Sequence, residues 1–143
     1  MLKNFFKKQK KEISNNKNIL VTALLIHAAK IDENYTELEK KIIKKAIINL
    51  NQINPDKAEE ILKLAEKKEE ESNQIVEFTR EIKKYSMDFR LKIIEIIWKI
   101  VYSDSTSDSY ESNLIGRICG LLYIPDKYNG IIKTKVQNIK KKI

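Results

Sequence analysis

Two pairs of acidic residues recur at the same spacing in the two halves of the sequence. Asp32 is followed by Glu39 and Asp104 by Glu111, so each aspartate precedes its glutamate by seven positions, and the pairs are offset by 72 residues. In each pair an apolar segment runs into the aspartate, and the glutamate falls in the first turn of the next expected helix. Repeated carboxylates are candidate ligands for hard cations, in two sites or in one that the halves share.

Helix capping offers a structural explanation for the two glutamates. Glu39 lies three residues after Thr36, and Glu111 lies three residues after Asp108. This is the spacing of a capping box, in which the glutamate accepts a hydrogen bond from the amide of the N-cap residue. On this interpretation both glutamates stabilise the start of a helix and bind no ligand.

The two aspartates are harder to explain in this way, because each lies at the C-terminal end of an apolar helix. The helix dipole presents partial negative charge there and disfavours a carboxylate by about 0.3–1 kcal/mol unless a cation offsets it. Lys30 or Lys99 could supply the positive charge, and so could a divalent metal bound by oxygen ligands. The residues alone leave both explanations open. A metal site here would take calcium, magnesium, manganese or zinc, with Asp108 as an additional ligand beside Asp32, Glu39, Asp104 and Glu111.

Other site chemistries lack the residues they require. The loops are not EF-hands, because the twelfth position, which must be glutamate, is Ile43 or Ile115. His27 is the sole histidine and Cys119 the sole cysteine, which excludes the usual zinc sites and a disulfide within the chain. The three glycines form no phosphate-binding loop. We therefore expect a binding domain and not an enzyme.

The hydrophobic periodicity predicts an all-α fold without strands. Thr36 and the pair Asn54-Pro55 mark helix starts, and the acidic run from Glu66 to Glu71 is expected to be a solvated helix end. The prediction is a compact bundle of seven to eight helices with an internal helix-loop-helix pseudo-repeat. The helices are expected near residues 1–12, 18–31, 36–50, 55–71, 75–82, 88–103 and 108–122, and from 125 into the basic tail.

A polar run from Ser14 to Asn18 is expected to break the chain near its start. It divides a basic amphipathic N-terminal segment (residues 1–16) from the helical domain (residues 17–143). Phe5 and Phe6 lie among lysines in the first segment. This combination suits an anionic membrane surface, and docking of the segment on the bundle is the alternative.

Length and composition bound the remaining function classes. A chain of 143 residues with 42% hydrophobic and 34% charged residues suits one globular domain. No apolar stretch reaches the ~20 residues of a membrane-spanning helix, and no signal peptide is recognisable. We expect a cytoplasmic protein, with a peripheral position at the inner membrane face as a further expectation. The net charge of +8 comes without a recognition-helix pattern, so nucleic-acid binding is not expected.

The doubled pattern of apolar helix, aspartate, polar loop and glutamate resembles the TerB-like domain of tellurite-resistance proteins. The same fold is shared with the N-terminal region of the DjlA co-chaperones. The resemblance covers roughly residues 19–133. Its closest local match is the stretch from Tyr110 to Ile115 together with that from Leu121 to Pro125. Where the family commonly has Ala-Asp-Gly, this sequence has Ile31-Asp32-Glu33 and Ser103-Asp104-Ser105.

The resemblance implies an all-helical cytoplasmic bundle. It also implies divalent-metal binding through the acidic positions and a role with protein partners in stress-response assemblies near the membrane. Chaperone activity is not implied, because the J-domain of the co-chaperones is absent. The alternative is a protein-interaction scaffold without metal, in which the acids only cap helices and pair with lysines. This scaffold would be held at the membrane by its basic N-terminus. The sequence predicts no oligomeric state.

Overall fold

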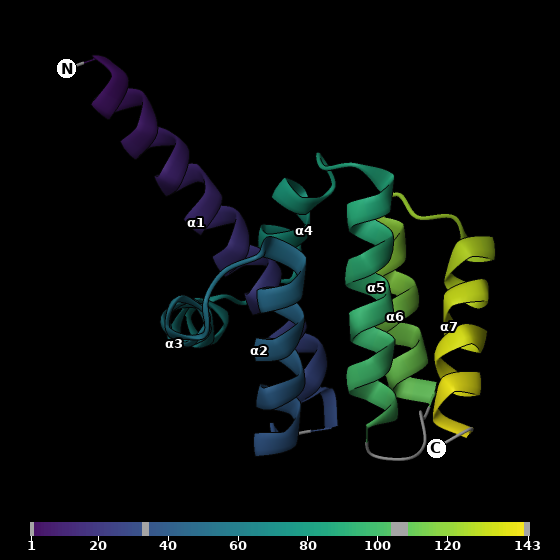
Figure 1. The fold of residues 1–143 in the computed structure, drawn as a ribbon. Coiled ribbons are helices and arrows are strands. Elements are labelled where there is room, and N and C mark those ends of the chain that lie inside the picture. The colour runs from purple at the N-terminus through teal and green to yellow at the C-terminus, as the bar shows by residue number, and fades with distance from the viewer. Residues whose placement is uncertain (1, 33–34, 104–108, 142–143) are drawn as a thin grey trace.

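The structure, a computed structural model, describes residues 2–32, 35–103 and 109–141. Within these ranges the chain is helical and has no strand, which confirms the all-α prediction (Figure 1). The described residues form seven α-helices and one 3-10 turn, in good agreement with the expected seven to eight helices. They are α1 (Leu2–Ala29), η1 (Lys30–Asp32), α2 (Glu37–Asn51), α3 (Pro55–Glu71), α4 (Val76–Ile82), α5 (Met87–Tyr102), α6 (Ser109–Leu121) and α7 (Asp126–Lys141).

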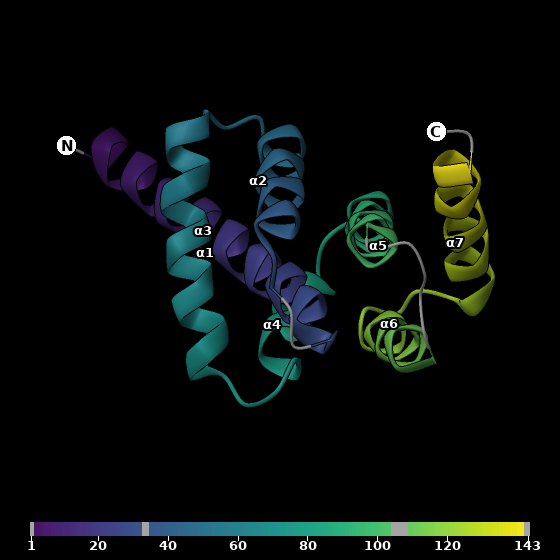
Figure 2. The same cartoon turned by 90° about the horizontal axis from the view of Figure 1, so that it is seen from below.

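The pseudo-repeat of the sequence corresponds to two similar helical units. In the first unit α3 packs mainly on α1 and also on α2, and in the second α7 packs mainly on α5 and also on α6. The repeat therefore extends to three helices in each half, with α4 as the link between them. Figure 2 shows α3 and α7 on opposite sides of the molecule, with α5 and the C-terminal half of α1 between them.

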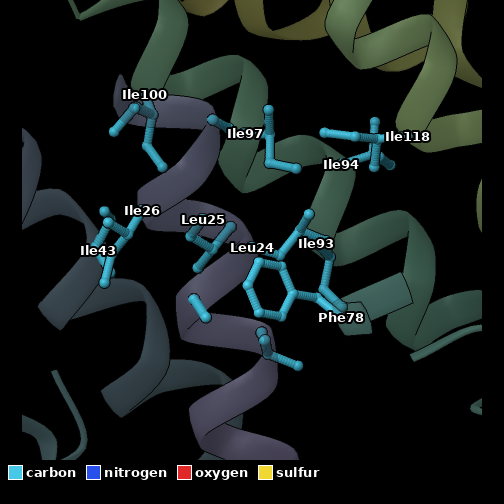
Figure 3. Close-up of a cluster of buried hydrophobic side chains, with 14 of the residues drawn as sticks. Leu24, Leu25, Ile26, Ile43, Phe78, Ile93, Ile94, Ile97, Ile100 and Ile118 are labelled. Carbon is cyan, nitrogen blue, oxygen red and sulfur yellow. The ribbon is translucent and has the colours of Figure 1, made fainter. Parts of the chain in front are cut away.

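The C-terminal half of α1 is the centre of the core. Val21, Leu24, Leu25 and Ile26 are fully buried there, and α1 contacts α2, α3, α4, α5 and α6. Figure 3 shows this stretch with buried side chains of the surrounding helices, among them Ile43, Phe78, Ile93 and Ile97. A helix that is apolar on all sides is stable in water only when neighbours cover every side.

Two of the predicted helix starts have the expected hydrogen bonds. At α2 the Thr36 side chain accepts from the amide of Glu39, and the Glu39 carboxylate accepts from the amide of Thr36, which completes the capping box. At α3 the Asn54 side chain accepts from the amide of Lys57, at 2.7 Å, and Pro55 occupies the first turn. These caps satisfy amides that have no partner within their own helix.

The break expected between Ser14 and Asn18 is wrong, because α1 runs continuously from Leu2 to Ala29. The run contains neither proline nor glycine, so its polar residues lower helix propensity by less than about 1 kcal/mol each. Tertiary contacts offset this cost. The ammonium of Lys17 lies 4.2 and 4.1 Å from the ring centroids of Tyr85 and Phe89. A separate role for residues 1–16 stays a prediction.

In the part of the chain that the structure describes, none of the helices combines the length and apolar character that a membrane crossing requires. α1 is the longest, with 28 residues, but lysines occupy much of its first half.

We expect Leu24→Ala to lower the free energy of unfolding by about 2–5 kcal/mol, because it leaves a cavity in the hydrophobic core around α1. Leu64→Ala is the matched control, since the Leu64 side chain is 46% exposed. It should change the stability by less than about 1 kcal/mol. Urea unfolding followed by circular dichroism measures both. Equal losses would contradict the central position of α1.

Candidate functional site

Three of the predicted acidic residues lie in the described part of the chain, at the end of η1 and at the starts of α2 and α6. Asp32 is the last residue of η1. Glu39 and Glu111 lie in the first turns of α2 and α6. The other two predicted ligands, Asp104 and Asp108, lie outside the described residues.

Glu39 and Glu111 are both buried, although they are charged residues at helix starts. The exposed fraction is 2% for Glu39 and 8% for Glu111. A buried carboxylate is costly unless hydrogen bonds or positive charge compensate it. The two positions that the repeat matches in sequence are therefore matched in burial as well.

Glu39 serves as the second half of the capping box. Its Oε1 accepts from the Thr36 amide at 2.9 Å and from the Thr36 hydroxyl at 3.0 Å. The Thr36 hydroxyl oxygen accepts from the Glu39 amide at 3.1 Å. The capping box predicted for Thr36 and Glu39 is thus confirmed.

The C-terminal ends of α1 and α5 and the starts of α2 and α6 lie at one end of the bundle (Figure 1). In Figure 1, α1 and α5 end at the bottom of the molecule, where α2 and α6 begin. The 3-10 turn that carries Asp32 contacts α6 of the other unit. The fold therefore brings the acidic turn of the first half beside the helix that carries Glu111 in the second half.

Glu69 of α3 lies close to this end and contacts two side chains of the first half of the chain, Lys30 and His27. Its Oε2 lies 2.7 Å from Lys30 Nζ, and its Oε1 lies 3.3 Å from His27 Nδ1. The Glu69 side chain is 10% exposed, so the prediction of a solvated helix end is wrong at this position. It holds for Glu70 and Glu71, which are exposed.

Tyr35 lies between charges of both signs. The ammonium groups of Lys40 and Lys30 lie 5.0 and 5.8 Å from its ring centroid. Burial raises the pKa of the Tyr35 hydroxyl, and the nearby carboxylates, with Glu66 foremost, raise this pKa further. The tyrosine is therefore protonated at neutral pH. The carboxylates that raise this pKa come from α2 and α3, so negative charge gathers near Tyr35.

Among the described residues, no three His, Cys, Asp or Glu side chains come together in a group that could hold a metal ion. Glu39 and Glu111 therefore do not make a metal site with the other described side chains. A site at this end would need the predicted aspartates, which precede Glu39 and Glu111 in the sequence. The predicted ligand set of Asp32, Glu39, Asp104, Glu111 and Asp108 stays a prediction.

Cys119 offers no reactive thiol. It is fully buried in α6, and burial, together with the charge of Asp126, raises the pKa of its thiol to about 12. Thiolate chemistry at neutral pH is therefore suppressed, in agreement with a core role.

The contacts of Glu69 with Lys30 and His27 could not be predicted from the sequence, because Glu69 is distant from the other two residues along the chain. His27 and Lys30 belong to the end of the first helix, whereas Glu69 lies 39 residues beyond Lys30. The acidic run around Glu69 was visible, but the periodicity of α3 could not identify which glutamate turns toward α1.

Comparison with known proteins gives one match. The sequence model of the family described as "Tellurite resistance protein TerB" matches residues 18–132, which is most of the chain. No curated protein and no solved structure matches.

We expect Glu69→Gln to lower the free energy of unfolding by about 1–2 kcal/mol, because it removes the carboxylate charge that pairs with Lys30. Glu60→Gln is the control. The Glu60 carboxylate pairs with Lys57 at 3.6 Å and is 61% exposed, so its loss should cost less than about 0.5 kcal/mol. Chemical unfolding of both variants measures the difference. An effect of Glu69→Gln no larger than that of the control would show that the Glu69 pair does not stabilise the fold.

Proposed function

The chain belongs to the tellurite-resistance TerB family, and from this premise we propose that it is a binding domain that holds a divalent metal at its acidic end. The proposal assigns no catalytic reaction. It places the protein in the cytoplasm, where it acts with protein partners in a stress response of the tellurite-resistance kind.

The observation that carries the proposal is the equivalent burial of Glu39 and Glu111 at one end of the bundle. One buried glutamate at a helix start is accounted for by its cap, as at Glu39. Here two buried glutamates lie at positions related by the repeat, near the 3-10 turn that ends in Asp32 and contacts α6. Their negative charge adds to the partial negative charge of the helix C-termini at the same end of the bundle. Carboxylate oxygens are the ligands that calcium, magnesium and manganese prefer.

Asp32 and Asp104 are the residues that we expect to hold the metal, with Glu39, Glu111 and Asp108 beside them. A bound divalent cation would supply positive charge to these carboxylates and to the C-terminal ends of α1 and α5. Binding would then stabilise the folded state and couple the two halves of the repeat, because ligands come from both.

The test is a titration of chelator-treated protein with calcium, magnesium, manganese and zinc in separate experiments. The thermal midpoint of unfolding is measured at each metal concentration. At 100 times its dissociation constant, a ligand of the folded state adds about 2.7 kcal/mol. For a chain of this size we expect an increase of roughly 5–10 °C. The double variant Asp32→Asn, Asp104→Asn should lose this increase.

The control is the double variant Asp88→Asn, Asp126→Asn. These aspartates are exposed in the first turns of α5 and α7, and both helices begin at the opposite end of the bundle (Figure 1). The control removes the same charge and should keep the metal-induced increase. No increase with any ion, or an increase that survives in Asp32→Asn, Asp104→Asn, would contradict the proposal.

A second candidate function is a metal-free interaction scaffold at the membrane. It is favoured by the N-terminal part of α1, which extends away from the other helices in Figure 1. The sequence of this part combines Phe5 and Phe6 with several lysines, and such a helix suits an anionic lipid surface.

Vesicle co-sedimentation tests this scaffold. We expect the full chain to sediment with vesicles that contain anionic phosphatidylserine and to remain in solution with neutral phosphatidylcholine vesicles, because lysine attraction needs lipid charge. A chain without residues 1–16 should lose the binding. Equal sedimentation of the full and shortened chains would reject membrane attachment through this segment.

A further inference from the structure

Helix α4 shows how a short helix covers a groove in this fold. It has seven residues and packs on α1 and α6. The N-cap residue Ile75 and the helix residues Phe78 and Ile82 are buried and lie at positions i, i+3 and i+7, the spacing of one helix face. The Phe78 ring points toward Leu24 of α1 and Ile93 of α5 (Figure 3).

The pseudo-repeat defines an equivalent groove on the other side of the molecule. It relates α1 to α5 and α2 to α6, so the counterpart of the α1–α6 surface that α4 covers lies between α5 and α2. These two helices are neighbours (Figures 1 and 2). The structure has an open groove of about 550 Å³ there, and its lining residues belong to α2, to the C-cap Gln52 and to α5. Among the described residues, no third helix contributes to it.

The groove has an apolar floor. Ile42, Ala46 and Leu50 of α2 line it at helical spacing, and Ile96 of α5 faces them. All four are only partly buried. This is the side-chain pattern of grooves that receive the apolar face of a helix.

The rim of the groove is basic. Lys45, Lys92 and Lys99 line it and are exposed, and none of the three makes an ion pair with a described residue. The one lining carboxylate, Glu95, already lies 2.8 Å from Lys135 of α7. The groove therefore presents positive charge that the described part of the chain does not neutralise.

We propose that the α2–α5 groove binds a short acidic amphipathic helix of a partner protein, in the way that α4 covers the equivalent surface between α1 and α6. The apolar face of the partner helix contacts Ile42, Ala46, Leu50 and Ile96, and its carboxylates face the three lysines. Charge complementarity selects the partner, and burial of its apolar side chains holds it.

The length of the groove agrees with a helix of the size of α4. Its α2 residues extend from Ile42 to Gln52 and its α5 residues from Lys92 to Lys99. At about 1.5 Å per residue these stretches span roughly 10–15 Å, or two to three helical turns. A basic segment such as the start of α1 in a second copy is disfavoured, because it would meet three lysines.

The test is binding of a fluorescein-labelled synthetic peptide to the full chain, measured by fluorescence anisotropy. The peptide has 12 residues with isoleucine, phenylalanine and isoleucine at the α4 spacing, glutamate on the flanking positions, and a hydrocarbon staple on its outer face. A second peptide carries lysine in place of each glutamate. We expect the acidic peptide to bind at least about tenfold more tightly than the basic one.

Two triple variants separate the groove from general electrostatics. Lys45→Glu, Lys92→Glu, Lys99→Glu should weaken the acidic peptide at least about tenfold. Lys41→Glu, Lys63→Glu, Lys67→Glu makes the same charge change at exposed lysines outside the groove and should weaken it less than about threefold. Circular dichroism confirms that both variants fold.

The site is located by amide chemical-shift changes, which should fall on α2 and α5. Equal weakening by the two triple variants, equal binding of the two peptides, or shift changes elsewhere would overturn the proposal. It would also be overturned if dodecanoate produced the groove shifts and the acidic peptide did not, since the site would then take a small amphiphile. None of these outcomes depends on metal binding at the acidic end.

Discussion

Burial of the C-terminal half of α1 is the constraint on which the rest of the structure depends. From Val21 to Ile26 every side chain is buried, so this helix has no face to present to water. Even Thr22 is satisfied within α1, because its hydroxyl donates to the carbonyl of Asn18 at 2.6 Å. Five other helices are needed to cover it. Because α1 belongs to the first half of the repeat and contacts α5 and α6 of the second, its burial fixes how the halves meet.

The position of the candidate sites follows from that arrangement. With α1 and α5 packed together, their C-terminal ends and the starts of α2 and α6 lie at one end of the bundle (Figure 1). The same packing places α2 beside α5, and no other described helix covers the groove between them, whereas α4 covers its counterpart. The acidic end and the basic groove are therefore separate consequences of one near-symmetric arrangement. Metal binding at the first and helix binding at the second can be tested independently.

Much of the fold could be predicted from the sequence, because its signals are local. The capping box at Thr36, the Asn54-Pro55 start and the apolar periodicity of α5 each depend on residues within one or two turns. The error at residues 14–18 arose because helix propensity is weak beside tertiary contacts such as those of Lys17 with Tyr85 and Phe89. The pairing of Glu69 with Lys30 and the α2–α5 groove could not be predicted, since both depend on how distant helices pack.

The most direct test of the metal-binding end is a crystal structure of the protein grown with manganese, with anomalous scattering used to locate the ion. We expect one or more anomalous peaks in contact with carboxylate oxygens where α1 and α5 end and α2 and α6 begin, with ligands that include Asp32 and Asp104. A saturated crystal with no peak there, or with manganese bound only elsewhere on the surface, would contradict it.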